Sequence, residues 1–346
     1  MIPPLLAGLS LPGVDELLDG AVVVAQPMHT RFRGTTVREA MLLHGPAGWA
    51  EFSPFPEYDA AESARWLAAA IEAGWHGWPA PVRDAVPVNA TVPAVRPDDV
   101  GRVLESFGAV PAVKVKVAEP GQGVDDDVAR VAEVRRLLPE AALRIDANQG
   151  WDHSTALAAL GRLAGYGLEY AEQPVAGIEG LARLREALDR AGIEVRLAAD
   201  ESVRRETDPV AVARAGAADL VVVKVQPLGG VRRALGIVEA AGLDAVVSSA
   251  LDTSVGIAAG VALAASLPRL PHACGLGTVA LFARDVAEVP WVPDAGLLRP
   301  GPAPVPVALD ALRAGEDRQR WWCSRLRAAY DVLAGQAGSG NSVPST

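Results

Sequence analysis

The sequence has little cysteine, no excess of basic residues and no long apolar segment. Its two cysteines, Cys274 and Cys323, are too few for a disulfide framework, and we expect a reducing environment. No stretch of about 20 uncharged apolar residues occurs, which argues against a membrane-spanning helix. The N-terminal residues lack the basic region and apolar core typical of a signal peptide. We therefore expect a cytoplasmic protein with no membrane partner.

The charge balance also excludes a class of partner. The 346 residues include 32 Lys and Arg against 42 Asp and Glu, a net charge of −10. Nucleic acid binding needs a basic face, so we expect no nucleic acid partner. Half of the residues are hydrophobic, enough for a large core, and the length suits a barrel of about 250 residues with an accessory domain. The chain is expected to be an enzyme acting on a small molecule, and its oligomeric state stays open.

One sequence pattern repeats between residues 85 and 278. A strand rich in β-branched residues is followed by polar or acidic residues typical of a helix N-terminus, and then by a helical segment. The predicted strands are AVPVNATV, AVKVKV, ALRIDAN, LEYAEQP, VRLAADES, DLVVVKVQP, DAVVSSAL and HACGLGT. Eight strands alternating with helices favour a parallel α/β barrel over an open sheet. A proline-rich stretch follows the eighth strand in place of a regular helix. We therefore predict a modified (β/α)8 TIM barrel of the (β/α)7β type.

Four segments are expected along the chain. Residues 1–84 form an α+β capping domain, with strands in GAVVVAQP and VREAMLLHG around the loop MHTRFRGTT and a helix in SARWLAAAIEAGW. Residues 85–285 form the barrel with the active site. Residues 286–335 include the helix RQRWWCSRLRAAYDVLA, which we expect to pack on the capping domain. The composition of residues 336–346 indicates a disordered tail.

Three acids end three successive predicted strands. Asp146, Glu172 and Asp200 follow one another at intervals of 26 and 28 residues, about one strand–helix unit each. Strand ends of a barrel meet at one mouth, where the active site lies. Converging carboxylates repel one another unless a cation neutralises them, and oxygen ligands suit Mg²⁺. The alternative, that each acid caps a helix or is an exposed loop charge, is less favoured for three consecutive repeats.

Three lysines end predicted strands as well. Lys114 and Lys116 are two residues apart and share one face of their strand. If that face is the barrel interior, the charge of Lys114 favours a neutral amine on Lys116, which makes a usable general base. Lys224 lies about four strands away and would face the acids from the other side. The alternatives are lysines in water and, for Lys224, a residue that snorkels at the rim.

Five of these segments together resemble the enolase superfamily, in its muconate-lactonizing-enzyme-like branch. The matching segments are VKVKV, RIDANQGW, YAEQP, LAADES and VVVKVQPLGG, in the family's order across the barrel. The resemblance implies a divalent metal, Mg²⁺ with Mn²⁺ as a substitute, and α-proton abstraction through an ene-diolate. It makes Asp146, Glu172 and Asp200 the metal ligands and Lys116 and Lys224 the acid/base pair. Lys114, Asn148 and Glu201 would support them.

Within that branch the sequence resembles the o-succinylbenzoate synthase family of menaquinone biosynthesis, in its actinobacterial form. The supporting segments are RFRG, SSALDTSVGI and ACGLGT. The resemblance implies a lyase that dehydrates 2-succinyl-6-hydroxy-2,4-cyclohexadiene-1-carboxylate to 2-succinylbenzoate. It also implies substrate contacts from the capping loop and the late strands, for which we take Arg31, Arg33, Ser249 and Gly277. The N-terminus departs from the usual opening of the family.

Four alternatives are weighed against this function. An N-acylamino-acid or dipeptide racemase would use the same two lysines on opposite faces. Sugar-acid dehydration is disfavoured because DAVVSSAL carries no histidine. A Schiff-base aldolase could use Lys224 or Lys116 but leaves the three acids unexplained. A non-catalytic barrel predicts no metal binding and gives no reason for lysines at one mouth.

Overall fold

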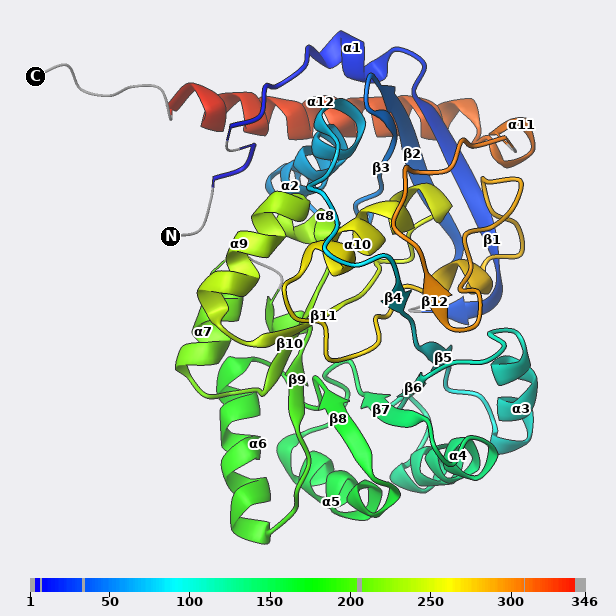
Figure 1. The fold of residues 1–346 in the computed structure, drawn as a ribbon, viewed down its shortest axis with the longest axis vertical. Coiled ribbons are helices and arrows are strands. Elements are labelled where there is room, and N and C mark those ends of the chain that lie inside the picture. Colours follow the sequence, from blue (N-terminus) through cyan, green and yellow to red (C-terminus); the bar gives the residue numbers. More distant parts are fainter. Residues whose placement is uncertain (1–3, 7, 33–34, 204–206, 308, 340–346) are drawn as a thin grey trace, which may run out of the picture.

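The computed structural model describes residues 4–6, 8–32, 35–203, 207–307 and 309–339, and at residues 30–32 and 337–339 it describes the backbone alone. An N-terminal α+β region lies above a barrel, and the long helix α12 (Glu316–Ser339) crosses the top of that region (Figure 1). No helix in the described ranges is long and apolar enough to cross a membrane.

The N-terminal region is a three-stranded antiparallel sheet covered by helices. After the short helix α1 (Val14–Leu18), strands β1 (Val22–Phe32), β2 (Thr35–Gly45) and β3 (Gly48–Phe52) pair in the order β1-β2-β3. Helix α2 (Ala60–Ile71) begins at Asp59, whose side chain accepts a hydrogen bond from the Glu62 N–H at 2.8 Å. A π-helical turn, Glu72–His76, continues α2. Strand β3 was not expected from the sequence.

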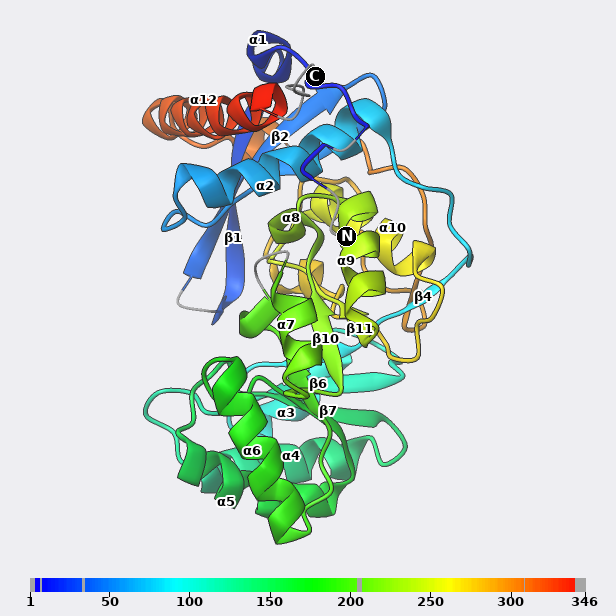
Figure 2. The same ribbon diagram turned by 90° about the vertical axis from the view of Figure 1, so that its left-hand side faces the viewer.

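The loop expected over MHTRFRGTT is largely strand. β1 extends to Phe32 and β2 resumes at Thr35, so the two form a long hairpin that projects from the N-terminal sheet (Figure 2). The register shifts between Pro27 and Phe32, since proline cannot donate to the ladder. Tertiary pairing therefore extends the strands beyond the apolar segments that predicted them.

The barrel follows the predicted alternation, and its strands run parallel in the order β11-β10-β9-β8-β7-β6-β5. The strands are β5 (Ala90–Val92), β6 (Ala112–Lys116), β7 (Ala142–Asp146), β8 (Leu168–Glu172), β9 (Leu197–Ala199), β10 (Leu220–Val223) and β11 (Asp244–Val247). The helices that surround them are α3 (Pro97–Glu105), α4 (Val124–Leu137), α5 (His153–Leu163), α6 (Ile178–Ala191), α7 (Asp208–Arg214), α9 (Val231–Ala241) and α10 (Ser254–Ser266). The sheet curls with its helices outside (Figure 1). The fold is thus a modified TIM barrel.

The eighth segment, HACGLGT, closes the ring with two bridges in place of a regular strand. Cys274 pairs with Val88 and Gly275 with Ser248, both in parallel. A 3-10 turn, Thr278–Leu281, follows where a complete barrel would carry its last helix. The expected absence of that helix is confirmed in the described residues.

Two further differences concern segment ends. The strand expected over DLVVVKVQP stops at Val223, and Val225–Leu228 forms the short helix α8. The first four residues of the tail expected over 336–346 belong to α12, which runs to Ser339; residues 340–346 lie outside the described ranges. The remaining short elements are β4 (Val86–Pro87), paired with β12 (Leu297–Leu298), and α11 (Leu309–Leu312).

The C-terminal helix packs against the N-terminal region. Trp322 and Leu326 of α12 are fully buried in one apolar cluster with Phe52 and Trp66. Trp322 contacts Phe52 edge to face, with ring centroids 5.8 Å apart. Residues from both ends of the chain therefore build the core above the barrel mouth.

Candidate active site

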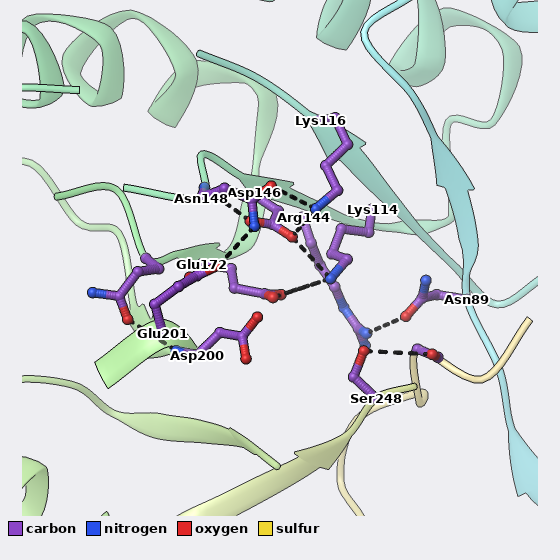
Figure 3. Close-up of polar contacts among 12 residues, drawn as sticks. Asn89, Lys114, Lys116, Arg144, Asp146, Asn148, Glu172, Asp200, Glu201 and Ser248 are labelled. Carbon is purple, nitrogen blue, oxygen red and sulfur yellow. Dashed lines mark hydrogen bonds and ion pairs between the residues drawn. The ribbon is translucent and has the colours of Figure 1, made fainter. Parts of the chain in front are cut away.

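Three acidic side chains meet at the carboxyl ends of neighbouring barrel strands. Asp146 ends β7, Glu172 ends β8 and Asp200 directly follows β9. Asp146 and Glu172 stand opposite each other in the strand register, and all three side chains are buried. Figure 3 shows the three carboxylates at the centre of the group. The structure thus brings together the acids that their spacing predicted to converge.

The lysines of β6 both point into the barrel. The Lys114 ammonium lies 3.0 Å from each Glu172 carboxylate oxygen and 3.1 Å from Asp146 Oδ2. Lys116 donates to Asp146 Oδ2 at 2.5 Å and to Asn148 Oδ1 at 2.7 Å (Figure 3). Burial alone would lower the pKa of Lys114, but Glu172 and Asp146 raise it above its ordinary value. Lys114 is therefore a fixed cation beside Lys116.

Lys224 faces the acids from the other side. It follows β10, and its ammonium is paired with the Asp200 carboxylate. In the order of the sheet, β7, β8 and β9 lie between β6, which carries Lys116, and β10, which Lys224 follows. The two lysines are thus separated by the three strands that carry the acids.

The acids form a donor set that suits a hard divalent cation. Burial, followed by the nearby charge of Asp146, raises the pKa of Glu172 to about 8. These buried carboxylates repel one another, and a cation would relieve that repulsion. In the described ranges no group of three or more His, Cys, Asp or Glu side chains is arranged to hold a metal ion. Lysine ammonium groups contact the three carboxylates in this structure. The carboxylates fit a divalent metal ion, which would take the place of some of these lysine ammonium groups as their partner.

Asn148 and Gln173 contact two of the acids: Asn148 donates from its backbone N–H, and Gln173 accepts with its side-chain oxygen. The Asn148 N–H donates to Asp146 Oδ1 at 3.1 Å, and its side-chain amide donates to Glu201 Oε1 at 3.0 Å. Gln173 accepts from the Asp200 N–H at 3.0 Å and donates to Ser202 Oγ at 2.9 Å. Both have positive φ, 44° and 38°, a conformation that non-glycine residues adopt rarely and often at functional sites. Gln173 follows Glu172 in the polar strand end EQP, but its role was not predicted from the sequence.

A cavity opens directly onto these groups. Phe55, from the loop after β3, lines it together with Lys116, Asp200 and Lys224. Ser249 lines it as well, and its hydroxyl lies 2.6 Å from that of Thr278, which the sequence analysis did not single out. Gly277 is not among the described residues that line the cavity; a Cβ there would approach the Asn89 carbonyl oxygen at 3.3 Å.

The β1–β2 hairpin reaches the rim of this cavity. Met28 pairs with Phe282 and packs against Leu251, which lines the cavity. Only the backbone of Arg31, in β1, is described, and Arg33 lies outside the described residues. The structure therefore places the base of the hairpin next to the cavity, and the contacts of the two arginines stay a prediction.

Comparisons with known proteins agree with this geometry. The family model described as "Enolase C-terminal domain-like" matches residues 98–304, and "Enolase N-terminal domain-like" matches residues 23–74. The o-succinylbenzoate synthase of Mycolicibacterium smegmatis is 51% identical over 325 residues, covering 93% of this chain and 99% of that protein. The o-succinylbenzoate synthase of Mycobacterium tuberculosis is 50% identical over 324 residues, covering 93% and 97%.

Solved structures support the fold. A muconate lactonizing enzyme from Pseudomonas fluorescens has a TM-score of 0.67 at 22% identity, covering 87% of this chain and 97% of that one. The L-Ala-D/L-Glu epimerase from Bacillus subtilis has a TM-score of 0.69 at 24% identity, covering 82% and 96%. With the near full-length relatives at half identity, these findings establish that the chain belongs to the o-succinylbenzoate synthase family of the enolase superfamily.

Proposed function

We propose that this chain catalyses the syn dehydration of 2-succinyl-6-hydroxy-2,4-cyclohexadiene-1-carboxylate to 2-succinylbenzoate, a step of menaquinone biosynthesis. The observation that carries the proposal is that Lys116 and Lys224, which line one cavity, stand on opposite sides of three buried carboxylates. The choice of substrate rests on membership of the o-succinylbenzoate synthase family.

The acids are the proposed ligands of the metal. Asp146, Glu172 and Asp200 would hold Mg²⁺, or Mn²⁺ in its place. Bound there, the ion would offset the negative charge that builds up on the substrate carboxylate when the α-proton leaves. Asn148 holds the Asp146 carboxylate through its backbone N–H, and Gln173 holds the backbone of Asp200 by accepting its N–H.

Lys116 is the proposed base. As a neutral amine it takes the α-proton of the substrate, and the Lys114 cation lies beside it on the same face of β6. The same amine then returns the proton to the departing hydroxyl group. The C–O bond breaks, water leaves from the face that lost the proton, and the ring becomes aromatic.

Lys224 acts from the opposite face. Paired with Asp200, it is the proposed ammonium that stabilises the negative charge of the ene-diolate. A recess next to this cavity shares Phe55 and Lys224 with it and is also lined by Tyr58 and Trp66. This aromatic recess beside the reacting centre is the proposed site of the succinyl chain.

The test is an assay for 2-succinylbenzoate with purified enzyme and Mg²⁺, followed by the absorbance of the aromatic product. We expect turnover that EDTA abolishes and Mg²⁺ restores. Lys116→Ala and Lys224→Ala should each lower kcat by about 10²–10⁴, the usual contribution of a general acid or base. Wild-type kcat in either variant would contradict the role of that lysine.

Racemisation of an N-acylamino acid is the second candidate. Lys116 and Lys224 on opposite sides of the acids are what a two-base proton transfer needs. A parallel assay with an N-succinylamino acid separates the functions: a kcat/KM above that of the dehydration would make racemisation the main activity.

A further inference from the structure

Helix α9 of the barrel lacks a negative charge of its own at its N-terminus. Its first turn has no acidic residue, and Gly230 before it provides no capping side chain. Helices α3, α4, α6 and α7 each carry Asp or Glu in their first turn. An uncapped N-terminus leaves N–H groups without partners and an unbalanced helix dipole. A carboxylate from another part of the chain can satisfy these N–H groups and supply the charge.

Glu72 of the N-terminal region supplies it. Its buried carboxylate accepts the Val231 N–H at 2.5 Å and the Arg232 N–H at 3.1 Å, and the Arg232 guanidinium approaches Oε1 to 2.8 Å. Gly230 makes room for this contact, because a Cβ there would overlap the Glu72 carboxylate. With φ at 120°, Gly230 also has a conformation that other residues rarely adopt. Glu72 therefore caps α9 from outside the barrel.

The same region holds the short helix α8, which joins Lys224 to α9. The Ser53 N–H donates to Gln226 Oε1 at 3.4 Å, and Arg65 Nε of α2 donates to the Pro227 carbonyl at 3.1 Å. Helices α2 and α8 lie against each other in both views (Figures 1 and 2). The segment directly after Lys224 is thus fixed at three places by residues outside the barrel.

The lysines of β6 are held differently. Asp146, Asn148 and Glu172, which accept hydrogen bonds from the Lys114 and Lys116 ammonium groups, belong to the barrel. We propose that Glu72 is a positioning residue for Lys224: by capping α9 it fixes the chain after Lys224 and thereby sets where the Lys224 ammonium stands. The inference rests on the proposed role of Lys224 in the reaction.

The test is a double-mutant cycle in the full-length enzyme with saturating Mg²⁺. Glu72→Gln keeps the shape of the side chain and removes its charge. We expect kcat to fall about 10- to 100-fold, since a shift on the order of 1 Å at a reacting group can cost about 100-fold. KM should stay at its wild-type value, because Glu72 lines neither cavity. The Mg²⁺ affinity, measured by thermal shift, should also be unchanged.

The decisive arm uses the Lys224→Ala background, with residual turnover measured at high enzyme concentration. If Glu72 acts through Lys224, adding Glu72→Gln there should change kcat by less than about twofold. An equal loss in both backgrounds, or wild-type kcat in Glu72→Gln, overturns the inference. Wild-type kcat in Lys224→Ala would instead overturn the role of Lys224 itself, so the two failures are distinguishable.

Asp219→Asn is the matched control. Asp219 precedes β10, at the end of the strand away from Lys224, and accepts the Leu197 N–H at 2.8 Å and an Arg185 N–H at 2.5 Å. Its loss should lower the melting temperature and leave kcat unchanged. If Glu72→Gln does not fold, Glu72→Asp is the variant to test. It retains the charge on a shorter side chain and should give a kcat between the wild-type value and the value expected for Glu72→Gln. Wild-type kcat in a folded Glu72→Asp, with Glu72→Gln unfolded, would also count against the inference.

Discussion

The carboxylate of Glu51, on β3, caps helix α10 of the barrel through Thr253. Its Oε2 accepts the Thr253 N–H at 2.9 Å and the Thr253 hydroxyl at 2.6 Å, and Oε1 accepts the Ser53 hydroxyl at 2.6 Å. Asp252 and Arg38 are buried beside it. Two carboxylates and one guanidinium therefore share a buried space between the N-terminal sheet and the barrel.

This cluster gives a pH-dependent stability. Burial, and then the charge of Asp252, raises the pKa of Glu51 from 4.5 to about 7. The folded state therefore holds a proton that the unfolded state loses above pH 4.5, so the contribution to stability is complete below about 4.5 and declines as the pH rises to about 7, at about 1.4 kcal/mol per pH unit. Glu51→Gln should flatten this decline in melting curves recorded with Mg²⁺. The exposed Glu105→Gln is the control and should keep the wild-type slope; identical slopes in all three proteins would contradict the assignment.

Metal binding should stabilise the wild-type protein. At 100 times the dissociation constant, Mg²⁺ should add about 2.7 kcal/mol to the free energy of unfolding, because it binds only the folded state. Asp146→Asn, Glu172→Gln and Asp200→Asn should each weaken this effect in thermal unfolding with and without Mg²⁺. Unchanged metal affinity in all three variants would show that other residues bind the ion.

Replacing either lysine of β6 should slow proton exchange, but to different extents. Lys116→Ala should abolish exchange of the substrate α-proton with solvent deuterium, because it removes the base. Lys114→Ala should reduce the exchange rate less, because it removes a neighbouring cation and leaves the base itself in place. Exchange is followed by mass spectrometry, and the reverse order would assign the base to Lys114.

Replacing Arg31 and Arg33 together by alanine should raise KM about tenfold or more, as a guanidinium–carboxylate contact is worth about 1.5–3 kcal/mol. The reason is that the hairpin bearing them reaches the cavity rim, where a guanidinium can meet the succinyl carboxylate. Steady-state kinetics with a Mg²⁺ titration checks this, and the metal affinity should not change. Unaltered KM and kcat would mean that specificity comes from the barrel alone.

The sequence by itself determined the barrel and the order of its polar strand ends. Eight alternating strand and helix segments favour a parallel barrel over an open sheet. Side-chain alternation then puts Lys114 and Lys116 on one face, and the strand ends put the acids at one mouth. These features repeat at regular intervals along the chain, so the local sequence pattern is enough to predict them. The resemblance to a known family added the roles.

Only the tertiary structure decided how the N-terminal region meets the barrel. The long β1–β2 hairpin, the helix after Lys224, and the capping of α9 and α10 by Glu72 and Glu51 depend on residues far apart in sequence. Gln173 likewise gained a role only when Asp200, 27 residues on, was placed against it. A lone buried glutamate carries no local signal, because the N–H groups that it satisfies belong to a helix some 160 residues further along the chain.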